Sequence, residues 1–154
     1  IDAPPSAIWP WLNHLDLPTA NEPLFRMGVA YPIRIETHGP DRTCVLSTGR
    51  MEERIIVADE NRLLRFQVLN TPPSMKELSP YDLHPSHLDD YYQCRTGEFE
   101  LRPLPDGGTL LIGRSTYRCR YAPEVYWKLW TRQIVHDVHL RVMNEVKRRA
   151  EQRP

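Results

Sequence analysis

PEVYWKLWTRQIVHDVHLRVMNEVKRR, residues 123–149, is the stretch that decides the fold, because it is the only long amphipathic segment in the chain. Pro123 suits the first position of a helix, where its missing N–H costs nothing. At about 100° per residue, the large apolar side chains fall on one face that is roughly 160° wide. These residues are Trp127, Trp130, Ile134, Val135, Val138, Val142 and Val146. A single helix with such a stripe predicts a broad sheet that it can lie against.

Upstream of this helix, apolar and polar residues alternate over short segments, as is typical of antiparallel strands. The segments are 33–37, 43–48, 54–58, 64–68, 98–102 and 110–121. Turn sequences such as Asp106-Gly107-Gly108 separate them. Near the start, Ile8, Trp9 and Leu12 recur at helical spacing, which predicts a short helix. We therefore expect one α+β domain over residues 1–154, with a curved antiparallel sheet of about six to seven strands wrapped around the last helix.

Residues 71–92 interrupt this pattern with four prolines and no regular period. Loops of this length are uncommon in compact domains and are usually functional. The segment also carries many apolar side chains, which favours a lid that folds over the rest of the molecule. Its candidate ligand-contacting residues are Met75, Tyr81, His84 and His87.

The composition is that of an ordinary globular protein, with 40% hydrophobic and 26% charged residues. Lysine plus arginine equals aspartate plus glutamate at 20 each, which gives no support to nucleic-acid binding. Cys44, Cys94 and Cys119 are odd in number and scattered, as expected for a reducing compartment, so we expect a cytoplasmic protein. The chain begins at Ile1 rather than methionine, and we expect that residues upstream were removed, which could include a first strand or a membrane tether.

The opening Ile-Asp-Ala-Pro-Pro-Ser-Ala-Ile-Trp, residues 1–9, resembles the first strand-to-helix junction of the START-like (SRPBCC) superfamily. Gly-Glu-Phe at 97–99 and Tyr-Trp-x-x-Trp at 126–130 resemble its polyketide cyclase/dehydrase-like branch, and the segments 44–49 and 77–80 add to the likeness. The resemblance implies the helix-grip fold, with a deep apolar cavity between the sheet and the last helix. The chain departs from the family pattern in its nearly absent first strand and in the long segment 71–92.

Within that implied cavity, a small hydrophobic or aromatic molecule or a lipid is the expected ligand, with no cofactor and no metal. The expected wall residues combine apolar side chains with a few polar groups, as ligand cavities do. They are Thr37, Cys44, Phe66, Phe99, Ser115, Tyr117, Trp127, Trp130 and Ile134. In contrast, Glu52, Glu53, Glu98 and Glu100 are expected to face mostly outward into solvent.

The main alternative is a metal-free, cyclase- or dehydratase-like lyase or isomerase that acts on a carbonyl substrate in the same cavity, with Tyr117 and a lid histidine as proton donors. Its catalytic residues are not identified by any motif, since the chain has no Gly-rich phosphate loop, Gly-x-Ser-x-Gly or His-Glu-x-x-His. A metal hypothesis rests on His136 and His139 together with His84 and His87. It is the weaker interpretation, because His136 and His139 are expected at the surface.

The back of the last helix carries a second apolar band, formed by Val125, Leu129, Leu140 and Met143. Such a band is either covered by the stems of neighbouring charged side chains or used for docking. The docking partners that we consider are a second copy of the chain and the missing N-terminal region. A non-catalytic interaction module that uses this face is the third functional hypothesis.

Overall fold

The protein is described by a computed structural model that covers residues 1–76 and 92–152. Its elements follow one another in the order expected from the sequence. They are α1 (Pro5–Asn13), β1 (Leu15–Asp16), α2 (Pro23–Arg26), β2 (Pro32–His38), β3 (Asp41–Leu46), β4 (Gly49–Asp59), β5 (Leu63–Val68), β6 (Tyr92–Pro103), β7 (Thr109–Cys119) and α3 (Glu124–Glu151). The predicted strands and the long C-terminal helix are therefore confirmed, whereas the short elements β1 and α2 were not predicted.

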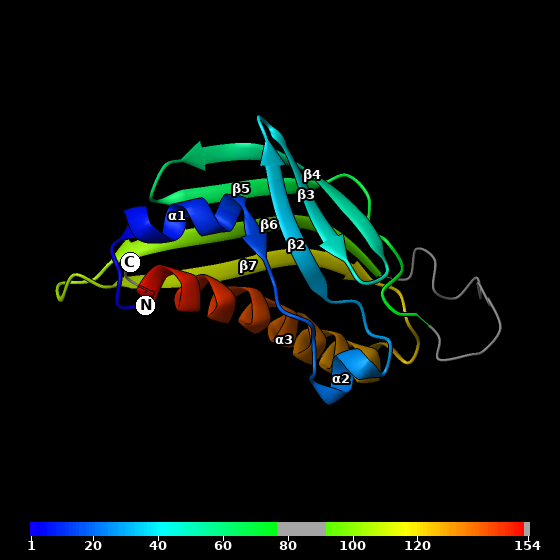
Figure 1. Cartoon of the computed structure of the whole chain (residues 1–154). Helices are drawn as coiled ribbons and strands as arrows, with labels where there is room; N and C mark the ends of the chain where they lie inside the picture. Colours follow the sequence, from blue (N-terminus) through cyan, green and yellow to red (C-terminus); the bar gives the residue numbers. More distant parts are fainter. Residues whose placement is uncertain (77–91, 153–154) are drawn as a thin grey trace.

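The strands of the described chain form one sheet of seven strands in the order β1-β2-β3-β4-β5-β6-β7, with every neighbouring pair antiparallel. The sheet curls, and α3 lies along its concave side next to β7 (Figure 1). This arrangement confirms the α+β prediction and the helix-grip layout. It follows from the short connections, because antiparallel neighbours can be joined by tight turns. At the β6–β7 turn, for example, Gly107 has a φ of +87°, a conformation that favours glycine.

Three β-bulges change which residues face the helix. The extra residue is Ile33 in β2, Ile56 in β4 and Arg95 in β6, as the pairing of their neighbours shows. A bulge places two residues opposite one, so the alternation of faces shifts by one position beyond it. Ile33 and Ile56 are consequently 40% and 51% exposed, although they are apolar. The prediction that Ile33 shares the buried face of Ile35 is wrong for this reason.

The interior is fully packed at the end of the molecule where α1 contacts the end of α3. Ile8 and Leu12 of α1 are buried against Val146 near the end of α3, together with Leu64 and Leu101 of the sheet. The first residues of the chain lie beside β7, where the backbone N–H of Thr109 donates to the carbonyl of Ile1 at 2.9 Å. Because this end is closed, any space between the sheet and α3 must lie towards the beginning of the helix.

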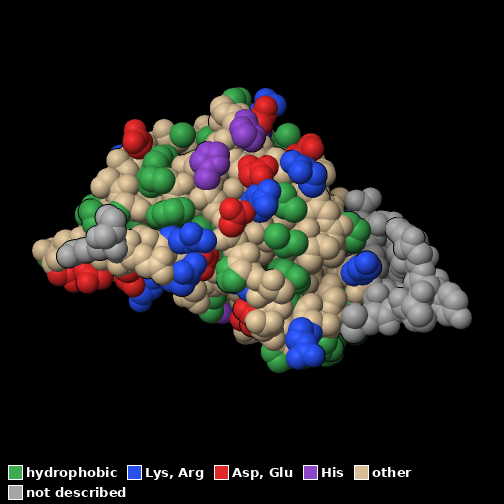
Figure 2. Space-filling model, viewed as in Figure 1, with side chains coloured by type: hydrophobic (Ala, Val, Ile, Leu, Met, Phe, Trp, Pro, Cys, Tyr) green, Lys and Arg blue, Asp and Glu red, His purple; other side chains and the backbone are tan. Residues whose placement is uncertain are grey.

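On the outer side of α3, Val125 is 76% exposed, Leu129 68% and Leu140 38%. Met143 does not belong to this apolar band, since it is half-buried and packs against the core beside Gly113. The band is therefore shorter than the sequence predicts, and docking through it stays a prediction. On the face of the molecule in Figure 2, acidic and basic side chains are interspersed rather than separated by sign. Among the described residues, no helix is both long and apolar enough to span a bilayer.

Candidate functional site

A cavity of about 600 Å³ lies between the concave side of the sheet and residues 127–142 of α3. Its volume falls within the range of roughly 300–1,000 Å³ that is usual for small-molecule sites. The wall contributed by α3 consists of Trp127, Thr131, Ile134, Val135, Val138, His139 and Val142. Trp127 and Val142 are 15 positions apart in the sequence, or about 22 Å along a helix. The cavity is thus elongated along the helix axis.

The sheet contributes a mainly apolar floor in which two phenylalanines lie side by side. The ring centroids of Phe66 and Phe99 are 6.2 Å apart. Gly97, opposite Phe66 in the sheet, has no side chain, and a Cβ there would lie 2.3 Å from the Phe66 ring. Gly97 therefore allows the ring of Phe66 to lie flat against the sheet and leaves the cavity open.

Six of the nine wall residues expected from the sequence line this cavity, namely Cys44, Phe66, Phe99, Ser115, Trp127 and Ile134. Thr37 does not, because it lies beside α1, where its hydroxyl donates to the carbonyl of Asn13 at 3.0 Å. Tyr117 is also absent from the lining, although its ring centroid is 5.4 Å from that of Tyr92. These two residues therefore do not line the cavity.

The same is true of Trp130, which is 48% exposed and outside the lining. Successive residues of a helix are turned by about 100°, so Trp130 lies about 120° from Val142 around α3, and His139 lies only about 60° from it. The face of α3 that points into the cavity is therefore rotated around the helix axis relative to the predicted apolar stripe, away from Trp130 and towards His139. His139, expected at the surface, lines the cavity instead.

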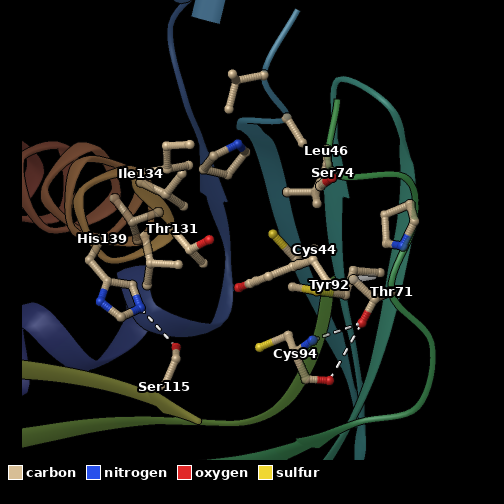
Figure 3. Close-up of a pocket in the computed structure, with 18 of the residues that line it drawn as sticks. Cys44, Leu46, Thr71, Ser74, Tyr92, Cys94, Ser115, Thr131, Ile134 and His139 are labelled. Carbon is tan, nitrogen blue, oxygen red and sulfur yellow. Dashed lines mark hydrogen bonds between the residues drawn. The ribbon is translucent and has the colours of Figure 1, made fainter. Parts of the chain in front are cut away.

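His139 is hydrogen-bonded to the sheet. Its Nε2 atom is 2.8 Å from the hydroxyl oxygen of Ser115 on β7 (Figure 3). Burial lowers the pKa of His139, and the neighbouring His136 lowers it further. The imidazole is therefore in its neutral form at pH 7, in which one ring nitrogen can accept a proton.

A buried ion pair forms another polar part of the wall. Arg42 of β3 donates through Nη1 to Glu53 of β4, and both side chains are almost completely buried. The guanidinium carbon of Arg42 also lies 4.3 Å from the centroid of the Phe66 ring. Burial raises the pKa of Glu53, and the adjacent Arg42 opposes this shift. The prediction that Glu53 faces outward is wrong, whereas Glu98 and Glu100 do point to the outer face, where they pair with arginines.

Two thiols lie in the wall, Cys44 on β3 and Cys94 on β6. Burial raises the pKa of Cys44 to about 12 and that of Cys94 to about 11. Because the thiolate is the nucleophilic form of cysteine, neither residue is suited to nucleophilic catalysis at neutral pH. They act in the wall as small, weakly polar groups.

Tyr92 and Cys94 are wall residues that the sequence did not identify: Tyr92 was expected in the segment 71–92 rather than in β6, and Cys94 was not placed in the cavity. Alternation from Phe99 alone would turn both side chains outward, but the extra residue brings them to the side of Gly97 and Phe99. Tyr92 enters the cavity from β6 towards the α3 side (Figure 3). Burial raises the pKa of its phenol, so the hydroxyl keeps its proton at physiological pH.

The described beginning of the expected lid, residues 71–76, forms part of the wall. Pro72, Pro73, Ser74 and Met75 line the cavity, and Met75 bridges to Val29 in the loop before β2. The backbone N–H of Lys76 donates to the carbonyl of Gly28 at 2.7 Å, which fixes this segment to that loop. Tyr81, His84 and His87 lie outside the described residues, so their expected role as a lid stays a prediction.

The metal hypothesis receives no support from the part of the chain that the structure describes, in which no group of three or more His, Cys, Asp or Glu could hold an ion. His136 is exposed and His139 faces the cavity. The two side chains therefore lie on different sides of α3.

Comparisons of the chain with protein-family models, curated proteins and solved structures found no match.

Proposed function

We propose that this protein binds an elongated hydrophobic or aromatic small molecule, or a lipid, between its sheet and α3. The observation that carries the proposal is the apolar cavity of about 600 Å³, lined by aromatic rings and aliphatic side chains with a few polar groups. Burial of a ligand there would be driven by removal of apolar surface from water, at about 25 cal/mol per Å². The likeness to START-like proteins in residues 1–9 and 126–130 supports the same function.

The polar groups of the wall are spread along the cavity rather than gathered at one point. Thr131 and His139 are eight positions apart on α3, which corresponds to about 12 Å. A reaction at one carbonyl carbon needs its acid and base within hydrogen-bond reach of the same few atoms. The separation therefore favours a carrier or sensor over an enzyme.

An enzyme remains the second candidate because of one observation, the contact between His139 and Ser115. A neutral imidazole in an apolar cavity can remove a proton from carbon next to a carbonyl, and Ser115 would orient it. Such a protein would be a cyclase- or dehydratase-like enzyme. Turnover of polyketide-like carbonyl compounds, lost on substitution of His139 by glutamine, would favour this candidate.

The binding proposal is tested with a neutral fluorescent probe, N-phenyl-1-naphthylamine, and a substitution that fills the cavity. Val138 lines the cavity, so Val138→Trp should weaken probe binding at least tenfold. Val125→Trp makes the same change at an exposed position of the same helix and should leave the dissociation constant within about twofold. Equal binding by the wild type and Val138→Trp, with both folded by circular dichroism, would contradict the proposal. Native mass spectrometry of the purified protein then identifies the class of any retained ligand.

A further inference from the structure

The polar side chains of the cavity differ in whether they already have partners. Among the described lining residues, the side-chain oxygens are hydrogen-bonded with one exception. Glu53 pairs with Arg42, Ser115 with His139, Thr131 with Cys119, Thr71 with the backbone of Cys94, and Ser74 with Tyr121. Glu98 belongs to the lining, but its carboxylate lies on the outer face, where it pairs with Arg65 and Arg114. The exception is the hydroxyl of Tyr92, which has no hydrogen-bond partner among the described residues and faces the cavity.

A hydroxyl in such a place is a binding group that none of the described residues uses. A ligand that accepts a hydrogen bond from it gains an interaction that a hydrocarbon cannot make. Tyr92 is held in position by its ring contact with Tyr117, at 5.4 Å between centroids. It is thus a pre-positioned donor inside an otherwise apolar space.

The charge of the surroundings indicates which acceptor fits. The cation nearest to the floor, Arg42, is already paired with Glu53, and an anionic ligand would meet no unpaired cation among the described lining residues. Burying an unpaired charge is costly. The complementary ligand group is therefore a neutral oxygen. A carbonyl fits best, because it accepts a hydrogen bond and carries no donor that would need a partner of its own.

We infer that the ligand of this cavity is an apolar ketone-type compound whose carbonyl oxygen accepts a hydrogen bond from Tyr92. The inference deepens the proposed function and rests on it. The aromatic or aliphatic body of the ligand lies along α3, between Trp127 and Val142, while Tyr92 fixes its position from the sheet side. Thr131, on the opposite wall in Figure 3, lies on the α3 side towards which Tyr92 points.

The test compares 2-acetylnaphthalene with 2-ethylnaphthalene, which have the same ring system and differ in the carbonyl oxygen. Dissociation constants of both are measured by quenching of tryptophan fluorescence. The wild type should bind the ketone about two- to tenfold more tightly than the hydrocarbon, the ratio given by one neutral hydrogen bond. Tyr92→Phe keeps the ring, removes the hydroxyl, and should abolish this preference while leaving hydrocarbon binding unchanged.

The matched control is Tyr117→Phe, which removes the same group from the neighbouring ring outside the cavity lining and should keep the preference. An equal ratio in the wild type and Tyr92→Phe would overturn the inference while leaving the proposed function intact. Failure of both naphthalenes to bind would instead remove the proposed function for this ligand class, and the inference with it. A second readout needs no variant: the infrared carbonyl stretch of the bound ketone should lie below its value in a hydrocarbon solvent, and an unshifted band would overturn the inference.

Discussion

Arginine–glutamate pairs occur in two very different places in this molecule. Arg42 and Glu53 lie in the cavity wall with 2% and 1% of their side chains exposed. On the outer face of the sheet, Arg114 pairs with Glu98 and Glu100 while half of its own side chain is in water. The same type of ion pair therefore has a large desolvation cost in the cavity wall and almost none on the outer face. Replacing one residue of the inner pair leaves a buried charge without a partner and should strongly destabilise the protein.

The largest effect is expected for Arg42→Met, which leaves Glu53 buried without a partner. We expect the free energy of unfolding to fall by about 3–5 kcal/mol at pH 8, measured by urea denaturation. Because the pKa of Glu53 is already raised by burial, this carboxyl can take up a proton as the pH falls. The loss in Arg42→Met should therefore be smaller at pH 5 than at pH 8.

The control for this prediction is the double variant Arg42→Met/Glu53→Leu, which removes both charges. It should recover most of the lost stability, since well-packed apolar residues can replace a buried pair with little cost. A double variant as unstable as Arg42→Met would show that the loss comes from packing around Phe66 rather than from the uncompensated carboxylate.

A smaller effect is expected for Glu98→Gln on the outer face, where the side chain keeps its shape and loses its charge. Its partners Arg65 and Arg114 are 44% and 50% exposed and can turn to water. The free energy of unfolding should change by less than about 1 kcal/mol under the same conditions. A loss comparable with that of Arg42→Met would mean that the outer network is not screened by solvent.

The smallest effect is expected at Glu100, whose pKa is shifted in the opposite direction to that of Glu53. Hydrogen bonds from Arg102 and Arg114 lower its pKa to about 2. A lowered pKa in the folded state stabilises the protein above the ordinary value of 4.5, and the contribution is lost as the pH falls towards 2. The difference in urea midpoint between the wild type and Glu100→Gln should therefore shrink from pH 7 to pH 2.5. For Glu53, whose pKa is raised, the contribution to the free energy of unfolding is instead largest at low pH. A difference in urea midpoint between the wild type and Glu53→Gln that also shrank on acidification would contradict the comparison.

The architecture could be predicted from the sequence because its signals are local. Alternation in segments such as 64–68 and 98–102 identified the strands, and the turn at Asp106–Gly108 identified a hairpin. The order of the sheet follows from such turns, since each strand pairs with the next. The helix at 124–151 was identified by its period, and Pro123, predicted at its first position, is its N-cap residue.

The cavity wall was harder to predict because it depends on the face that each strand turns to the helix. The bulge at Arg95 cannot be seen in alternation, and it decides the placement of Tyr92 and Cys94. Glu53 could have been found, because it shares the strand face of Met51 and Ile55, but its charge outweighed that signal. His139 was missed because the centre of the inward helix face is set by packing of α3 along β7, and not by the apolar residues alone.

The two borders of the sheet have a further consequence, for assembly. A strand at the border of a sheet offers unpaired N–H and C=O groups to any other chain, which is a route to aggregation. Here one border ends in β1, only two residues long. The other, β7, lies beside α3 (Figure 1). It carries the exposed side chains of Arg114 and Arg118. The short β1 at one border, and α3 and the arginines at the other, therefore limit the addition of further strands and the growth of the sheet into fibrils.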